Sequence, residues 1–505
     1  MGFKIVFIGA GSIGFTRKLL TDILSVPAFQ DVQVAFTDTN SNNLQMVYRL
    51  CQRDIEANGL KIKIQATLDR REAFKDANYV INCVRIGMLE AFTHDVEIPL
   101  KYGVDQCVGD TLCAGGIMYA QRDIAAFKEF CKDIREVAAP SCIMLNYANP
   151  NAMVTWYCNK YGGVPTIGLC HGVQGGHRLI AQVLGYKPNE VDIICAGINH
   201  MTWYLSVKHQ GVELKDQLLN AFEANPEIVQ TEKVRLDVMR RFGYFSTESN
   251  GHLSEYLPWY RKRTDAIMRW IDLGKWINGE TGGYLRVCME GRNWFETDFP
   301  NWLKEPPMRY EQRARGQEHG SYIIEGLETG KIYRGHFNVV NHHAISNLPE
   351  DCIVEVPGYV DMHGVHIPPV GALPLGCAAM CQSNITVQRL AMEAGAVGDI
   401  SLLRQAMMMD PLVGAVCSLE QIWQMVDEML IAEAEWLPQY QQEICMAKER
   451  RRQGEANGTL IPPIITKGAA RLHTKTVEEM ALNKINARDN AANADKAMER
   501  PAMKK

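Results

Sequence analysis

The chain has 505 residues, a formal net charge of −5 at pH 7 and 22% charged residues. Because a nucleic-acid surface needs an excess of basic side chains, this balance argues against a nucleic-acid partner. The N-terminus lacks a signal-peptide pattern, and no apolar run reaches the roughly 18 residues of a membrane span. We therefore expect a cytoplasmic protein that has no membrane partner.

The 15 cysteines are scattered along the chain without the spacing of a disulfide framework. We predict that they are reduced thiols, as is usual in the cytosol. The length of the chain suggests two or more packed units.

The chain opens with a pattern typical of a dinucleotide site. Lys4–Ile8 is an apolar run of strand length, and it is followed by Gly9, Gly11, Ser12 and Gly14 in the spacing G-x-G-x-x-G. Such glycines allow a tight turn, approach of the backbone to a pyrophosphate, and close packing of the following helix on the strand. The pattern alone is weak, because ordinary strand-to-helix corners also use glycine.

Two further apolar runs strengthen this interpretation. Val32–Thr37 ends at Asp38, close to the offset at which an acidic residue binds the ribose hydroxyls of NAD. Tyr79–Val84 contains Asn82 and leads to Arg85. Because ligands bind at the carboxyl ends of parallel strands, we expect Asn82 to contact the cofactor and Arg85 to lie near the nicotinamide.

Strand and helix signals alternate to about Gly163 and then become mixed. This order predicts an α/β protein in which an N-terminal Rossmann-type, doubly wound parallel sheet packs on a mixed α+β substrate domain, as in lactate and malate dehydrogenases. The expected divisions are a nucleotide domain at 1–165, a catalytic domain at 166–440 and a polar C-terminal extension, solvated and helical or flexible, at 441–505.

Cys170 and His200 each follow an apolar, strand-like run. Thiolate and imidazole would suit a divalent transition metal with open positions for substrate oxygens. Two ligands thirty residues apart do not form a local metal motif, so a core cysteine and a core histidine remain an equal alternative. Residues 243–260 form a third segment rich in polar and phenolic groups, for which an aromatic packing loop is the alternative.

Seven segments in this order resemble glycoside hydrolase family 4, the NAD- and metal-dependent glycosidases. They are IGAGSIGF, GDTLCAGGI, LNYANP, GLCHGVQG, AGINHM, GYFSTESNGHLSEYLPWY and NLPEDCIVEVPGYVD. The resemblance covers about residues 1–440, and it is greatest to the α-galactosidase branch.

The resemblance implies hydrolysis of an unphosphorylated hexoside, since His171 stands where relatives acting on 6-phosphoglycosides have Asp or Asn. An α-galactoside is the first expectation. The branch tends to show Cys-His-Ser, whereas this chain has Gly172 after His171. A hexuronide, either an α-galacturonide or an α- or β-glucuronide, is therefore the alternative.

The chemistry implied by this resemblance differs from the usual glycosidase scheme with two carboxylates. NAD oxidises carbon 3 of the sugar, and a divalent metal assists removal of the proton on carbon 2. The aglycone then leaves by elimination, water adds, and the hydride returns, so NAD is not consumed.

The resemblance also implies residue roles. Cys170 and His200 match the metal ligands, and manganese is the implied ion. Tyr256 is expected to be the base for the proton on carbon 2, because a phenol near a metal and NAD⁺ can have a lowered pKa. Tyr244 and Tyr260 are its rivals.

For protonation of the leaving group we expect His171, with Asp110 as its competitor or as a ligand of substrate hydroxyls. Asn149 is expected to bind sugar hydroxyls, although a plain turn is the alternative for its segment. Arg85 would hold a hydroxyl or pair with the carboxylate of a uronide. The resemblance suggests a homodimer or a homotetramer.

Two other functions fit parts of the sequence. A plain NAD-dependent dehydrogenase would share the first half of the chain and would consume NAD stoichiometrically. A binding protein that senses a sugar or NADH would keep the nucleotide fold and lose the metal site.

Overall fold

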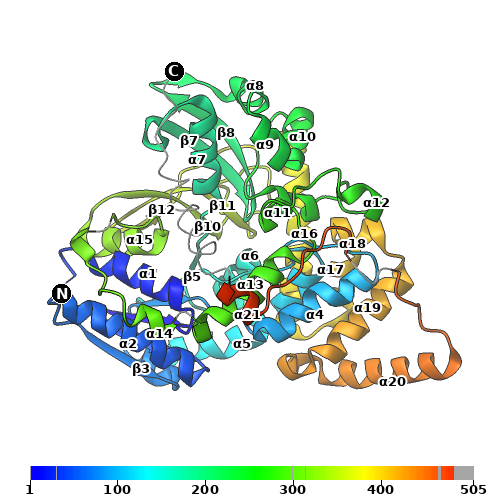
Figure 1. Cartoon of the computed structure of the whole chain (residues 1–505), viewed down its shortest axis with the longest axis horizontal. Coiled ribbons are helices and arrows are strands. Elements are labelled where there is room, and N and C mark those ends of the chain that lie inside the picture. The colour runs from blue at the N-terminus through cyan, green and yellow to red at the C-terminus, as the bar shows by residue number, and fades with distance from the viewer. Residues whose placement is uncertain (1, 30, 298, 313, 465–467, 483–505) are drawn as a thin grey trace.

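The computed structural model describes residues 2–29, 31–297, 299–312, 314–464 and 468–482. Its centre is a 12-stranded sheet in the order β3-β2-β1-β4-β5-β6-β10-β11-β7-β8-β9, with β12 paired to β11 (Figure 1). The parallel strands are β1 (Lys4–Ile8), β2 (Gln33–Thr37), β3 (Lys63–Thr67), β4 (Tyr79–Asn82), β5 (Ile143–Asn146) and β6 (Thr166–Gly168). The antiparallel strands are β7 (Val191–Ile198), β8 (Met201–His209), β9 (Val212–Glu213), β10 (Tyr333–Val340), β11 (Ile353–Asp361) and β12 (Gly364–His366).

The predicted α/β class is confirmed, because the order of the parallel strands is that of a Rossmann-type sheet. The three apolar runs predicted to be strands form β1, β2 and β4, and each strand ends within two residues of its expected bounds. The sheet continues without a break from β6 into β10. The two units expected at 1–165 and 166–440 therefore share one sheet, and the boundary between them stays a prediction.

Helices cover both faces of the parallel strands. Ile5 and Phe7 share one cluster with α1 (Ile13–Leu24), α2 (Ser41–Ala57) and α15 (His319–Thr329). Val6 and Ile8 point to the other face, where α5 (Cys113–Val137) and α6 (Asn151–Tyr157) pack. Because both faces are buried, these strands are apolar throughout rather than alternating.

The other helices extend this core. They are α3 (Arg70–Phe74), α4 (Met88–Lys101), α7 (Gly172–Leu184), α8 (Leu218–Glu223), α9 (Pro226–Thr231), α10 (Lys233–Phe242), α11 (Asn250–Tyr256), α12 (Thr264–Ile267), α13 (Gly283–Thr297), α14 (Phe299–Trp302), α16 (Leu375–Val397), α17 (Ile400–Met409), α18 (Pro411–Val416), α19 (Leu419–Ala432), α20 (Gln441–Asn457) and α21 (Val477–Leu482). Figure 1 shows α7 to α10 around the β7–β8 hairpin at the top and α16 to α20 at the right.

One row of paired residues runs across the middle of the sheet. Asn82 pairs with Asn146, which pairs with Gly168 at the end of the parallel half. Gly168 pairs with Asn338, Asn338 with Glu355, and Glu355 with Gly197. The row aligns the carboxyl ends of the parallel strands with the β7–β8 turn, which brings distant loops to one edge.

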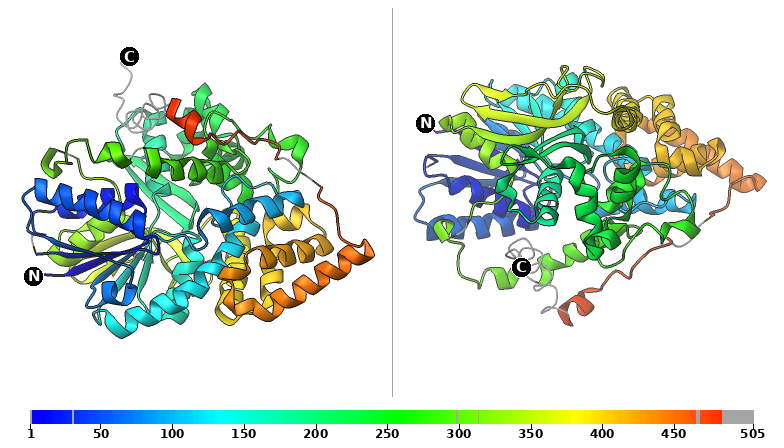
Figure 2. Two further views of the ribbon diagram at one scale, coloured as in Figure 1. Left: turned by 60° about the horizontal axis from the view of Figure 1, so that its bottom comes forward. Right: turned by 90° about the horizontal axis from the view of Figure 1, so that it is seen from above.

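The C-terminal extension is more closely packed than a solvated tail. Helix α20 buries Ile444 and Ala447, and the chain then returns along the molecule towards α13 (Figure 2). Thr281 donates its backbone N–H to the carbonyl of Ala470, and Arg471 forms an ion pair with Glu97. Among the described residues, no helix is both long enough and apolar enough to cross a bilayer.

Candidate active site and metal centre

The glycine-rich turn after β1 is fastened to the end of β2. The Gly11 N–H donates to Asp38 Oδ2 over 2.7 Å. Gly9 has φ of +79°, and a Cβ there would lie 2.8 Å from the backbone of Cys83, so both conformation and space require glycine. Ser12 and Gly14, which follow the turn, are exposed at the start of α1, where a pyrophosphate site requires accessible backbone.

The other predicted cofactor residues surround this turn. Ser12 is the exposed N-cap residue of α1, and Asn82 donates to Asn146 over 2.7 Å. A Cβ at Gly14 would meet no described atom within 4 Å, so packing of α1 on a strand does not require glycine there. The expected packing reason for Gly14 is therefore wrong, while the cofactor roles of these residues stay predictions.

Cys170, His200 and Glu248 form one cluster at the edge of the sheet. Cys170 lies two residues after β6, and His200 occupies the two-residue turn between β7 and β8 with φ of +64°. Glu248 lies between α10 and α11. One ligand atom from each of the three residues falls within 4.8 Å of the other two.

Contacts within this cluster are direct. Cys170 Sγ lies 3.4 Å and His200 Nε2 lies 3.9 Å from Oε2 of Glu248. Thiolate, imidazole and carboxylate together are a donor set for a divalent transition metal, and their spacing lets one ion reach all three. These residues therefore fit the metal that the family resemblance implies.

Burial and charge act differently on two members of the cluster. Burial, followed by the charge of Glu248, raises the pKa of the Cys170 thiol well above its usual range. Burial also acts to raise the pKa of Glu248, but the nearby His200, His252 and His171 and the hydrogen bond from Cys170 together lower that pKa. A divalent cation would favour the thiolate and so would offset the buried negative charge.

Three polar residues of the site were missed by the sequence analysis. Glu248 and His252 lie in the third segment, and Glu355 lies in the last of the seven segments, but the sequence alone predicts no role for them. His252 is buried beside His200, with ring centroids 4.9 Å apart, and Glu355 accepts from Asn199 over 3.3 Å. The polar character of the segments could have pointed to these residues. Their contacts with the metal cluster, however, depend on how the strands pair in the folded sheet.

Asp110 is surrounded by the residues expected to bind substrate. It is buried, it accepts from Asn149 Nδ2 over 3.1 Å, and its Oδ2 lies 3.6 Å from Nη2 of Arg85. The Arg85 guanidinium also lies over the rings of Phe92, at 4.5 Å, and Tyr119, at 5.3 Å. Polar groups from three loops therefore meet here.

Tyr256 is the tyrosine of its segment that approaches the cluster, since its hydroxyl lies 3.5 Å from Nδ1 of His200. The hydroxyl of Tyr260 donates to Asp237 instead, and the ring of Tyr244 faces Lys215. Burial, followed by the charge of Glu255, raises the pKa of Tyr256, whereas a cation at the cluster would lower it.

His171 lies at the open side of the cluster. Its side chain is 62% exposed, and its Nδ1 lies 3.7 Å from Oε2 of Glu318. Asp110 is instead enclosed and engaged by Asn149 and Thr111. The two candidates for leaving-group acid therefore differ in access to solvent, and the assignment stays a prediction.

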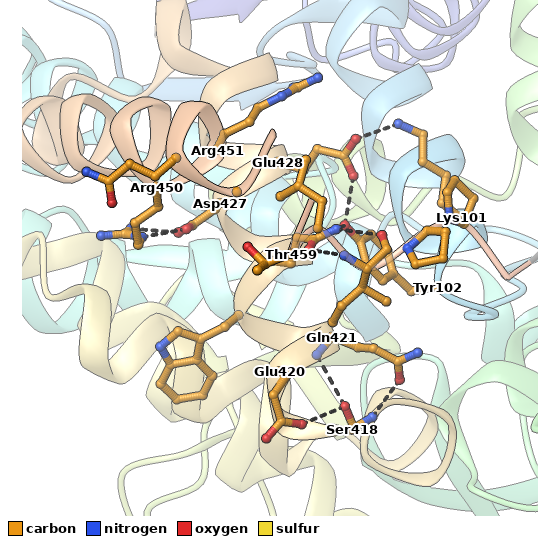
Figure 3. A pocket seen from close by; sticks show the side chains of 18 of the residues that line it. Lys101, Tyr102, Ser418, Glu420, Gln421, Asp427, Glu428, Arg450, Arg451 and Thr459 are labelled. Carbon is orange, nitrogen blue, oxygen red and sulfur yellow. Dashed lines mark hydrogen bonds and ion pairs between the residues drawn. The ribbon is translucent and has the colours of Figure 1, made fainter. Parts of the chain in front are cut away.

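A separate groove of about 1230 Å³ lies between α19, α20 and residues 459–463 (Figure 3). Its three cations are already paired, Lys101 with Glu428, Arg450 with Asp427 and Arg451 with Glu455. None of the predicted site residues lines it. The chemistry is therefore concentrated at the sheet edge and not in this groove.

Gly172 makes room for Glu248. A Cβ at Gly172 would lie 1.7 Å from Oε2 of Glu248, so we expect Gly172→Ala to push the carboxylate away from Cys170 and His200. The affinity of the EDTA-treated protein for Mn²⁺, measured by calorimetry, should fall by about tenfold or more. Gly175→Ala is the matched control, because a Cβ there meets nothing within 4 Å. Equal affinity in both variants would contradict this explanation.

Burial, followed by the charge of Glu248, raises the pKa of Glu355 to about 8. The folded state therefore keeps a proton that the unfolded chain loses at lower pH, and this contribution to stability is lost as pH rises towards 8. In EDTA-treated protein, the thermal midpoint of Glu355→Gln minus that of wild type should increase as pH rises from about 4.5 to 8. A difference that is constant over this range would show that Glu355 does not titrate there.

Comparisons with known proteins agree on one family. Residues 4–186 match the sequence model of Family 4 glycosyl hydrolase, and residues 195–413 match that of the Family 4 glycosyl hydrolase C-terminal domain. An α-galactosidase of Rhizobium meliloti (strain 1021) is 55% identical over 491 residues, which are 97% of this chain and 99% of the relative. That alignment includes most of the C-terminal extension, which lay outside the resemblance seen in the sequence.

More distant relatives extend the comparison. An α-galacturonidase of Thermoanaerobacterium saccharolyticum is 26% identical, over 84% of this chain and 94% of the relative. A structure of the 6-phospho-β-glucosidase of Thermotoga maritima with manganese, NAD⁺ and glucose-6-phosphate shares the fold. Its TM-score is 0.70 at 22% identity, over 86% of this chain and 99% of that one. The two matching sequence models and the 55% identical relative show that the chain belongs to glycoside hydrolase family 4.

Proposed function

We propose that this protein hydrolyses α-galactosides with the help of NAD and a divalent metal, for which manganese is the first choice. The observation that carries the proposal is the Cys170, His200 and Glu248 cluster at the same sheet edge as the glycine-rich turn. The α-galactosidase at 55% identity supports the substrate, and the manganese and NAD⁺ complex of the more distant structure supports the cofactors.

Two bound groups would supply chemistry that side chains lack. Bound NAD⁺ would supply a hydride acceptor for carbon 3 of the sugar, and a bound metal would supply a Lewis acid for the sugar oxygens. Gly9, Gly11, Ser12, Gly14 and Asp38 would hold the nucleotide. Asn82, at the end of β4, would complete this site.

The protein's own side chains would bind the sugar and move its protons. The Tyr256 hydroxyl oxygen would take the proton from carbon 2, which its approach to His200 supports. His171 would protonate the leaving group, since it is the more exposed of the two candidates. Asp110 and Asn149, which are hydrogen-bonded to each other, would orient sugar hydroxyls.

The surroundings of Arg85 favour an uncharged sugar over a hexuronide. Its guanidinium faces the Asp110 carboxylate at 3.6 Å and three aromatic rings, those of Phe92, Tyr119 and Tyr284. Asp110 offsets part of the charge of Arg85, which makes a second carboxylate a weaker partner. The buried Nη1 of Arg85 has no hydrogen-bond partner among the described residues and is left to donate to a sugar hydroxyl. The 26% identical α-galacturonidase keeps the hexuronide as the alternative to be tested.

All 15 cysteines are free thiols, which supports a reducing compartment and therefore the cytoplasmic location. A homodimer or homotetramer remains part of the proposal because of the family. A plain dehydrogenase or a binding protein that senses a sugar would have no use for the metal cluster, so both are less well supported.

Release of nitrophenol from 4-nitrophenyl α-galactoside, α-galacturonide and α- and β-glucuronide tests this proposal. The assay contains NAD⁺, Mn²⁺ and a thiol reductant, and each is omitted in turn. We expect α-galactoside hydrolysis that requires both NAD⁺ and Mn²⁺ and that accumulates no NADH. Steady NADH formation from a small alcohol without nitrophenol release would instead favour the dehydrogenase, and faster cleavage of a uronide would overturn the choice of sugar.

A further inference from the structure

The loop that precedes α5 is held by a buried carboxylate. Glu255 accepts the backbone N–H groups of Cys107, Val108 and Gly109, at 2.7, 3.0 and 3.1 Å. Glu255 is itself completely buried and lies in α11, next to Tyr256. This clamp fixes the position of the two residues that follow, Asp110 and Thr111, relative to the helix that carries the predicted base.

Thr111 lies between a carboxylate and a histidine. Its Oγ1 is 2.8 Å from Oδ1 of Asp110 and 3.1 Å from Nδ1 of His200. All three residues are buried. The opposite nitrogen of His200, Nε2, faces Glu248 at the metal cluster.

Two hydroxyl groups face Nδ1 of His200, that of Thr111 at 3.1 Å and that of Tyr256 at 3.5 Å. The contact with Tyr256 is too long for a good hydrogen bond, so the closer Thr111 decides where the protons lie. A carboxylate only accepts, so the single hydroxyl proton of Thr111 must go to Asp110, because two acceptor oxygens would otherwise face each other at 2.8 Å. The Thr111 oxygen then accepts from His200, which requires the proton of the neutral imidazole to be on Nδ1. Nε2, which lies 3.9 Å from Oε2 of Glu248, is then left with a free lone pair.

We propose that Thr111 is a positioning residue of the metal site. Its hydroxyl links Asp110 to Nδ1 of His200 by hydrogen bonds and so leaves Nε2 free to bind the metal. The inference rests on the proposed function, because it concerns how a ligand of that metal is held. A partner of this kind fixes both the tautomer and the ring orientation of a ligating histidine. The Glu255 clamp explains why this hydroxyl stays at the required distance.

Binding of Mn²⁺ to the full-length protein after EDTA treatment, followed by the loss of the free Mn²⁺ signal in electron paramagnetic resonance, tests the inference. Thr111→Val keeps the shape but removes the hydroxyl, so we expect a 10- to 100-fold loss of affinity. Thr111→Ser restores the hydroxyl and should return the affinity close to that of wild type. The affinity for NAD⁺, measured by fluorescence, should be the same in all three proteins.

Further variants separate the possible failures. If Thr111→Val does not fold, as judged by circular dichroism, Thr111→Ala carries the same test with a smaller side chain. Suppose that Cys170→Ser loses Mn²⁺ binding while a folded variant without the Thr111 hydroxyl keeps the wild-type affinity. This result would overturn the inference about Thr111 and leave the proposed metal site standing. If wild type does not bind Mn²⁺, or if Cys170→Ser binds it unchanged, the proposed metal site fails and the inference fails with it.

Discussion

Antiparallel pairing of β10 with β6, between Asn338 and Gly168, joins the parallel and antiparallel halves of the sheet. A Cβ at Gly168 would lie 2.8 Å from the Cβ of Asn338 and 2.0 Å from Oδ1 of Asn151, so the joint depends on glycine. Through this joint, the loop after β6 with Cys170 comes to face the β7–β8 turn with His200. Because side chains in a strand alternate between faces, a shift of one residue would turn the polar row of Asn338 and Glu355 away from the site.

Polar groups that are buried at this edge favour a bound cation. Cys170, Glu248 and Glu355 lie close together at low solvent exposure, and burial raises the pKa of the thiol and of Glu355. Removing such groups from water is unfavourable unless they are paired or coordinate a metal. Without a metal, the raised pKa values keep protons on the Cys170 thiol and on Glu355, and a divalent cation would favour loss of the thiol proton.

The sequence predicted the first part of the fold well, because its signals are local. Short motifs predict the turn of Gly9 and Gly11 and the acidic Asp38 directly after β2. The apolar strands are recognisable because they are buried on both faces. Glu248 could not be recognised in this way. It is 78 residues from Cys170 along the chain, and only the folded sheet brings the two together.

Gly172 shows a different limit of sequence reasoning. As a departure from the Cys-His-Ser pattern, it points to a different sugar. In the structure it has a steric reason, which is the Glu248 carboxylate lying where a Cβ would be. Gly172 therefore acts directly on the metal site, by leaving space for Glu248. Its effect on the choice between a galactoside and a uronide is indirect.

The central claim is that one metal ion binds between Cys170, His200 and Glu248. Anomalous diffraction at the manganese edge, from crystals grown with Mn²⁺ and NAD⁺, tests it most directly. We expect one strong peak within about 2.0–2.5 Å of Sγ of Cys170, Nε2 of His200 and a carboxylate oxygen of Glu248. A peak at other side chains, or none at this cluster in metal-loaded active enzyme, would contradict it.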